Sequence, residues 1–168
     1  MSKLKGITKL NNTISAQLAS FGISKAFLST DYAYYWEQEK VSYKLTETVE
    51  DEWFCEFINE RFGYMVKYPM VMALLHEIGH HMTDDDLGDV VEDFCEVEKE
   101  RIDKEMLTAD EDYSKVLEWQ YFNLPDEIIA TAWAVNYAKQ HPQKIRKMHN
   151  TILNALMEFY TINNLTED

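Results

Sequence analysis

Two different patterns of apolar residues occupy the first quarter of the chain. Residues 6–20 place an apolar side chain at every third or fourth position, which predicts an amphipathic helix that Gly22 ends. Residues 23–45 instead contain three short β-prone runs, at 26–28, 32–36 and 41–45, separated by polar residues. We expect these three runs to form a small antiparallel meander.

Helical patterns return after residue 46 and continue to the end of the chain. Thr48, with Asp51 three residues later, is typical of a helix start, and Gly63 is typical of a helix end. Pro69 suits the first turn of a helix that runs to about Met82. Three more helices are predicted, over about 125–140, from 142 onward, and over about 89–106 with the apolar positions Val90, Phe94, Val97 and Ile102.

Three strands among six helices predict a mostly helical α+β fold, with the small antiparallel sheet before the helix at 69–82. The 168 residues suit one domain, so we expect a single domain over 1–168. The chain is 46% hydrophobic, which is enough to build a core and argues against a disordered protein.

The net charge of −14 is concentrated in one part of the chain. Residues 84–112 contain fourteen acidic side chains and only three basic ones. Such a balance argues against nucleic-acid binding, which needs a basic surface. The acidic segment is either a solvated helix face that aids solubility or a negatively charged surface that selects basic partners.

Localisation signals are not recognisable in the sequence. The apolar runs are shorter than the roughly 18 residues that a membrane span needs, and the basic N-terminal stretch lacks the apolar part of a secretory signal. Cys55 and Cys95 each lie alone in an apolar stretch, which does not make a disulfide framework. We therefore expect a cytoplasmic protein that does not bind membranes.

An H-E-x-x-H motif at residues 76–80 lies on the helix predicted from Pro69. Because helical residues four apart share one face, His76 and His80 can bind the same metal ion. Neutral imidazoles suit zinc, which in catalytic sites has three protein ligands and one position open for water. Glu77 lies beside that face, where it can act as the general base for a metal-activated water. The expected cofactor is therefore Zn²⁺.

A third zinc ligand is expected among the acids that follow His80. Glu127 lies at the start of an otherwise apolar helix, and a buried carboxylate has to be paired, neutralised or bound to a metal. Glu127 is therefore favoured as the ligand, although Asp126 and Glu127 could simply complement the positive end of the helix dipole. The rival ligands are three acids spaced four apart on one helix face: Glu92, Glu96 and Glu100.

The two motifs together resemble those of the gluzincin metallopeptidases, in which a Glu on a later helix completes the zinc site. The segment Glu127-x-x-Ala130-Thr131-x-Trp133-Ala134 is similar to the E-x-x-A-[D/N]-x-[F]-A segment of ImmA/IrrE-type and related phage and bacterial zinc proteases. The resemblance covers about residues 68–140.

This resemblance implies a zincin-like domain with zinc at His76, His80 and Glu127, and with Glu77 as the base. The acidic segment, over about 83–112, is then an insert between the two motifs. Thr131 stands where the family has Asp or Asn. We therefore expect the supporting hydrogen bond at that position to be weaker or differently made.

A zinc protease also needs a hydrogen-bond donor for the oxyanion that forms during peptide hydrolysis. Four side chains are candidates, and the sequence does not rank them: Tyr121, Tyr137, His141 and His149. His149 shares a helix face with apolar residues, which is more typical of a core histidine than of a catalytic donor.

The sequence thus predicts a zinc metallopeptidase that hydrolyses a protein or peptide substrate, and the acidic segment predicts that this substrate is basic. The alternative is a catalytically silent zinc-binding protein whose acidic segment binds a partner. Intact Glu77 argues against that alternative, because a structural zinc site has no use for this carboxylate and is closed by a fourth protein ligand. A DNA mimic is a weaker idea, because the negative charge lies in one segment.

Overall fold

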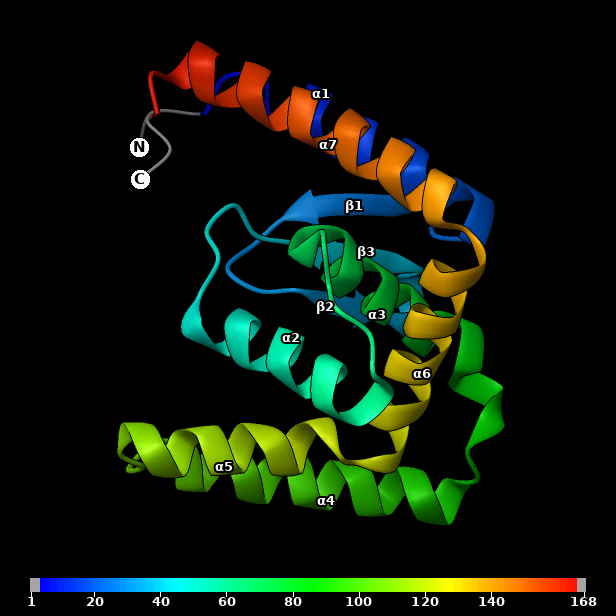
Figure 1. The fold of residues 1–168 in the computed structure, drawn as a ribbon, viewed down its shortest axis with the longest axis vertical. Helices are drawn as coiled ribbons and strands as arrows, with labels where there is room; N and C mark the ends of the chain where they lie inside the picture. The colour runs from blue at the N-terminus through cyan, green and yellow to red at the C-terminus, as the bar shows by residue number, and fades with distance from the viewer. Residues whose placement is uncertain (1–3, 166–168) are drawn as a thin grey trace. The chain divides into compact units, whose positions relative to one another are not determined.

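A computed structural model describes residues 4–165, which contain seven α-helices and a three-stranded sheet. The predicted mostly helical α+β class is therefore confirmed (Figure 1). The chain forms two compact units, one made of residues up to Leu45 together with those from Ala138 onward, the other of Thr46–Tyr137. The predicted single domain over 1–168 stays a prediction, and its first and last three residues lie outside the described range.

The sheet belongs to the first unit and is mixed, so the predicted antiparallel meander is wrong. Its strands are β1 (Lys25–Leu28), β2 (Ala33–Tyr35) and β3 (Lys40–Tyr43), in the order β1-β3-β2. β3 pairs in parallel with β1 and antiparallel with β2. The last three side chains of β3 are buried, whereas Tyr35 of β2 is exposed. A strand buried on both faces suits the centre of a sheet, which is where β3 lies, between the other two strands.

Two long helices pack together in the same unit. α1 (Ile7–Leu18) buries Leu10, Ile14 and Leu18, which are the predicted helical positions, and it contacts both β1 and α7 (Pro142–Asn163). The short 3-10 helix η1 (Ala19–Phe21) follows α1 and ends at Gly22, whose φ of 87° favours glycine. A second 3-10 helix, η2 (Trp36–Gln38), joins β2 to β3.

The second unit contains the helix with the H-E-x-x-H motif, and the sequence predicted its first two helices well. α2 (Val49–Phe62) begins with a capping box between Thr48 and Asp51 and ends at Gly63. α3 (Pro69–Thr83) begins with proline in its first turn, and the 3-10 helix η3 (Asp84–Asp86) follows it. Eight of the nine positions from Val71 to Gly79 are buried, all but Ala73, so α3 is a core helix.

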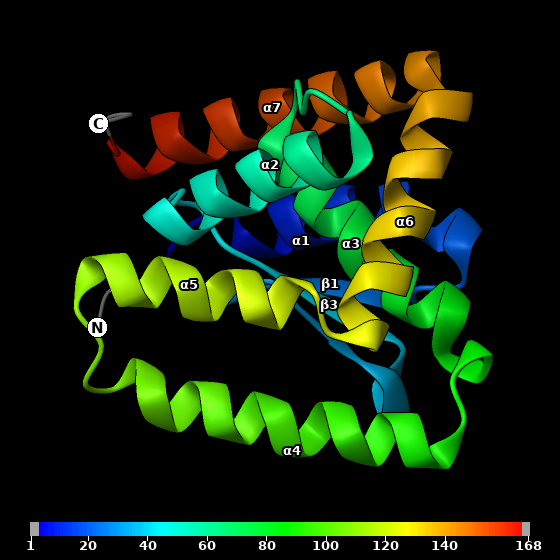
Figure 2. The same cartoon turned by 60° about the horizontal axis from the view of Figure 1, so that its bottom comes forward.

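The acidic segment of this unit forms most of a helical hairpin. α4 (Asp89–Met106) and α5 (Glu111–Phe122) lie side by side and run antiparallel (Figure 2). The sequence analysis missed α5, although Asp110 accepts a hydrogen bond from the backbone of Tyr113 and so caps this helix. The last helix of the unit, α6 (Pro125–Gln140), begins and ends where it was predicted.

Three of the four apolar positions that indicated helix α4 do not lie on its packed face. Val90, Phe94 and Val97 are 82%, 52% and 64% exposed, and only Ile102 is buried. The face that packs against α5 and the start of α6 instead forms a cluster with four buried members: Cys95, Ile102, Leu117 and Leu124. Burial follows the position of the neighbouring helix, which the spacing of apolar residues on α4 does not show. Among residues 4–165, no helix is both long and apolar enough to cross a membrane.

Candidate metal centre

The two histidines of the H-E-x-x-H motif lie one turn apart on α3, with their rings turned toward each other. Their Nε2 atoms are 3.2 Å apart, and the ring centroids are 4.7 Å apart in an edge-to-face arrangement. His76 is buried, and His80 is partly exposed. Both imidazoles therefore present the same nitrogen to one point, as the helical spacing predicts.

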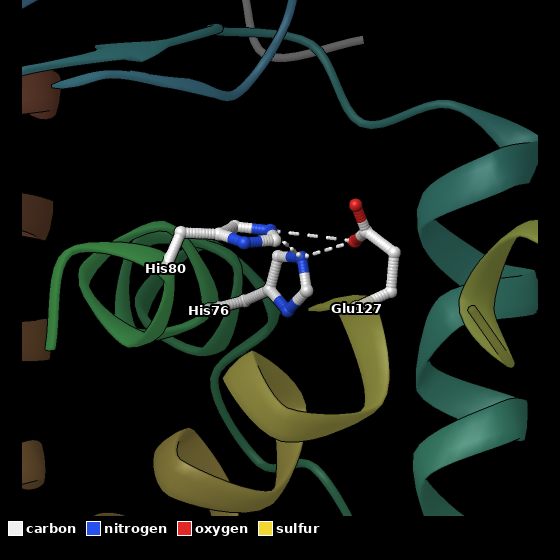
Figure 3. A group of neighbouring side chains, drawn as sticks. All are labelled: His76, His80 and Glu127. Atoms are coloured by element: carbon white, nitrogen blue, oxygen red, sulfur yellow. Dashed lines mark hydrogen bonds and ion pairs between the residues drawn. The ribbon is translucent and has the colours of Figure 1, made fainter. Parts of the chain in front are cut away.

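Glu127, from the first turn of α6, brings a carboxylate to the same point (Figure 3). Its Oε2 lies 2.9 Å from Nε2 of His76 and 3.4 Å from Nε2 of His80. One ligand atom from each of these three residues lies within 4.8 Å of the other two, close enough to hold one ion. The rival ligands Glu92, Glu96 and Glu100 are all exposed on α4, and none of them belongs to this group.

The charges at this point favour a bound cation. Burial raises the pKa of Glu127, but the imidazoles of His80 and His76 outweigh it and hold this pKa well below its ordinary value. Burial lowers the pKa of His80, but Glu127 and Glu77 outweigh it and raise this pKa to about 9. The carboxylates therefore stabilise positive charge between the imidazoles, which is the property that a metal site needs.

Two small residues allow α3 and α6 to approach closely enough for this geometry. A Cβ added at Gly79 would lie 2.3 Å from the backbone carbonyl oxygen of Ala130, well inside van der Waals contact. No side chain fits at position 79 unless the backbone moves. Ala130 is fully buried and lies one turn after Glu127. The close contact between the helices therefore also sets the distance between the Glu127 carboxylate and the two histidines.

His76 is oriented by two further contacts. Its Nδ1 lies 3.0 Å from the hydroxyl of Thr131 on α6, and the ring of Phe54 on α2 meets it edge to face at 5.1 Å. When Nε2 binds a metal, Nδ1 carries the proton and donates to the Thr131 oxygen. The hydroxyl thus makes the kind of supporting bond that an Asp or Asn makes in the family that the motif resembles.

Glu77 lies beside the ligand face, as predicted, and is only 8% exposed. Burial raises the pKa of Glu77, although the nearby His76 and His80 oppose this change. A carboxylate with a raised pKa accepts a proton more readily, which suits a general base. The position and environment of Glu77 are therefore compatible with the role expected for it.

Lys99 is a site residue that the sequence analysis missed. Its ammonium, from α4, lies 2.5 Å from Oε1 of Glu127 and 2.5 Å from Oδ2 of Asp126. The signal was present in the helical spacing, because Lys99 falls on the same face as the buried residues Cys95 and Ile102. The acidic segment therefore contributes a cation, and not an acid, to the metal centre.

Among the four candidate oxyanion donors, Tyr121 lies next to this site. Lys99, which contacts Glu127, lies 5.1 Å from the centre of the Tyr121 ring. Burial and the carboxylates of Glu127 and Glu77 raise the pKa of Tyr121, so its hydroxyl stays protonated and able to donate. Tyr137 stacks on Trp133, and His141 and His149 belong to the first compact unit.

The donor set fits zinc: two imidazole nitrogens and one carboxylate oxygen, with room in the coordination sphere for a water. No family model, characterised protein or solved structure was found to match this chain. The case for a function therefore depends on the site geometry and on the chemistry of its residues.

Proposed function

We propose that this chain is a zinc-dependent metallopeptidase of the gluzincin type, with zinc bound by His76, His80 and Glu127. The observation that carries the proposal is the convergence of these three ligand atoms, with a buried Glu77 next to the first ligand. A structural zinc site is closed by a fourth protein ligand, and the described residues offer only three ligands at this point.

A zinc ion, when bound, supplies a Lewis acid that polarises a peptide carbonyl and makes water nucleophilic near neutral pH. Glu77 accepts the proton that the attacking water loses and delivers it to the amine of the departing product. Tyr121 is the favoured donor to the oxyanion, because its hydroxyl stays protonated and its ring lies next to Lys99 at the site. Thr131 keeps Nε2 of His76 directed at the metal position.

The proposal is tested by Glu77→Gln, which removes the base and keeps the size of the side chain. The variant should bind zinc as the wild type does and hydrolyse a quenched fluorescent peptide library at a rate at least about 100-fold lower, because general-base catalysis contributes about that much. Glu60→Gln, a change at an exposed glutamate of α2, serves as the matched control and should keep full activity. A Glu77→Gln variant that is fully active would contradict the mechanism.

A basic substrate is part of the proposal, because the acidic side chains of α4 lie in the same compact unit as the metal centre. Exposed acids raise the local concentration of cationic peptides, and added salt screens this attraction. A Lys-rich peptide should therefore be cleaved faster than a Glu-rich version, and the advantage should shrink between low and high salt. Identical salt responses of the two peptides would contradict this preference.

The alternative, a zinc-binding protein that does not cleave its partner, is favoured by one observation. Val90, Phe94 and Val97 form an exposed apolar row on α4 among acidic residues, which suits a partner with basic and apolar side chains. Zinc-loaded wild-type protein that holds a partner without cutting it would support this alternative and exclude the peptidase.

We also propose a cytoplasmic location. Cys55 and Cys95 are both free thiols in the structure, which is usual for proteins of reducing compartments. Measuring where the tagged protein resides in cell fractions tests this part of the proposal.

A further inference from the structure

Lys99 makes a close ion pair with Glu127, a ligand of the candidate metal centre. Its ammonium lies 2.5 Å from Oε1 of Glu127, whereas the other oxygen of that carboxylate, Oε2, faces the two imidazoles. The two oxygens of Glu127 therefore have different partners. Only Oε2 is directed at the metal position.

We propose that Lys99 is a positioning residue that holds Glu127 as a one-oxygen metal ligand. A carboxylate at the end of a free glutamate side chain can rotate and offer both oxygens to a metal. The contact between Lys99 and Oε1 restrains this rotation, because turning Oε1 toward the imidazoles breaks a charge-assisted hydrogen bond. The fourth coordination position then stays open for a water.

Lys99 is itself held in place by contacts on two sides. Its Nζ lies 2.5 Å from Oδ2 of Asp126 and 5.1 Å from the centre of the Tyr121 ring. The side chain is only 26% exposed, so these contacts hold the ammonium at a fixed place, which a restraint on Glu127 requires.

The position of Lys99 on α4 gives the acidic segment a second role. α4 packs through Cys95 and Ile102 against neighbouring helices, and Lys99 lies between these two residues on the same face. The packing of α4 therefore determines where the ammonium meets Glu127. Ligand geometry at the metal centre depends in this way on a helix that contributes no ligand.

The test compares zinc binding by wild-type protein, Lys99→Met and Lys99→Arg, since Met keeps the length of the side chain and Arg keeps its charge and donors. Chelator competition should show zinc affinity 10–100-fold lower in Lys99→Met, the usual effect of losing a partner of a ligand. Lys99→Arg should restore the affinity to within about threefold of wild type. Lys104→Met on the exposed face of α4 is the matched control and should leave affinity unchanged.

Cobalt substitution provides a readout that a general loss of stability does not change. Lys99→Met should shift the visible absorption of the Co²⁺ protein toward the weaker bands of five-coordinate cobalt, because Glu127 then binds through both oxygens. Lys99→Arg should keep the wild-type spectrum. Wild-type affinity and spectrum in Lys99→Met would overturn the proposal, and so would tighter zinc binding by this variant.

This inference rests on the proposed zinc site, and the two can fail separately. Wild-type protein that binds no zinc contradicts the proposed function, whereas zinc binding that is insensitive to Lys99 contradicts only the positioning role. If circular dichroism shows that Lys99→Met is unfolded, Lys99→Gln decides, since its amide keeps a donor near Oε1 without the charge. Lys99→Gln should bind zinc more weakly than Lys99→Arg, and equal affinities of the two would overturn the role of the charge.

Discussion

α3 and α4 belong to the same compact unit, but their apolar residues are buried to different extents. On α3 the apolar residues from Val71 to Ile78 are buried except Ala73, and the polar residues buried among them, His76 and Glu77, belong to the candidate site. On α4 three apolar residues face the solvent, while the charged residue Lys99 is on the packed side. Apolar spacing therefore identified both helices, but it gave the correct buried face only for α3.

The difference between the two helices has a physical cause. α3 is surrounded by neighbouring side chains, so the choice of face hardly matters for its burial. α4 packs on one side, against α5 and the start of α6, and that side has to accommodate Lys99 because two carboxylates lie opposite it. The packed side of α4 thus combines apolar residues with an ion pair, so apolar spacing alone does not identify it.

The largest effect should come from removing a ligand on α3. His76→Ala should lower zinc affinity on the order of 1,000-fold, since three ligands share a binding free energy of about 10 kcal/mol or more. Equilibrium dialysis with a competing chelator measures this loss. His81→Ala, one residue beyond the motif and outside the ligand group, should bind zinc as the wild type does. Equal losses of zinc affinity in both variants would show that the predicted helix face is not the metal-binding face.

Gly79→Ala probes the contact between α3 and α6. The added Cβ meets the carbonyl of Ala130, and overpacking of this kind should destabilise the protein by about 3 kcal/mol. Gly88→Ala, at the start of α4, meets no atom within 4 Å and should change stability by less than about 0.5 kcal/mol. Urea unfolding followed by tryptophan fluorescence distinguishes the two. A neutral Gly79→Ala would show that the helices can separate freely.

Ile102→Ala tests the packed face of α4. Ile102 is 2% exposed in the cluster with Cys95, and truncation should cost about 2 kcal/mol because it leaves a cavity. The free energy of unfolding from urea titration is the measurement. A loss of unfolding free energy no larger than that of a surface substitution would show that Ile102 does not lie on the packed face of α4.

Phe94→Ser should have the smallest effect of the series, on the opposite face of α4. The ring is 52% exposed, so the free energy of unfolding should change by no more than about 0.5 kcal/mol. Urea unfolding of Phe94→Ser and Ile102→Ala under the same conditions compares their free energies of unfolding. A loss of more than 2 kcal/mol in the free energy of unfolding would show that the side of α4 carrying this ring is the packed one.

Local signals in the sequence were sufficient for the parts of the fold that local chemistry determines. The capping box at Thr48 and the prolines at the first turns of α3, α6 and α7 set helix starts that were predicted to within a residue or two. Strand order was not predictable in this way, because it depends on which strand the helices bury. α5 was missed although the Asp110 cap and the acidic residues of its first turn are local signals of a helix start.

The candidate site was predictable where it follows helical spacing and not where it depends on tertiary packing. His76 and His80 follow from the i, i+4 rule, and Glu127 follows from a carboxylate at the start of an apolar helix. Lys99 and the choice of Tyr121 among four donors required the three-dimensional arrangement of α4, α5 and α6.

The contact of Gly79 with Ala130 also limits how the coordination sphere can change in evolution or by design. Main-chain atoms of α3 and α6 already touch at this point, so the two helices have no freedom to move closer together. A shorter acid in place of Glu127, such as aspartate, would leave a gap of one methylene that the backbone is unable to close. The reach of the third ligand is thus specified by the spacing of two helices, and aspartate is a poor substitute for glutamate here although its charge and donor atoms are the same.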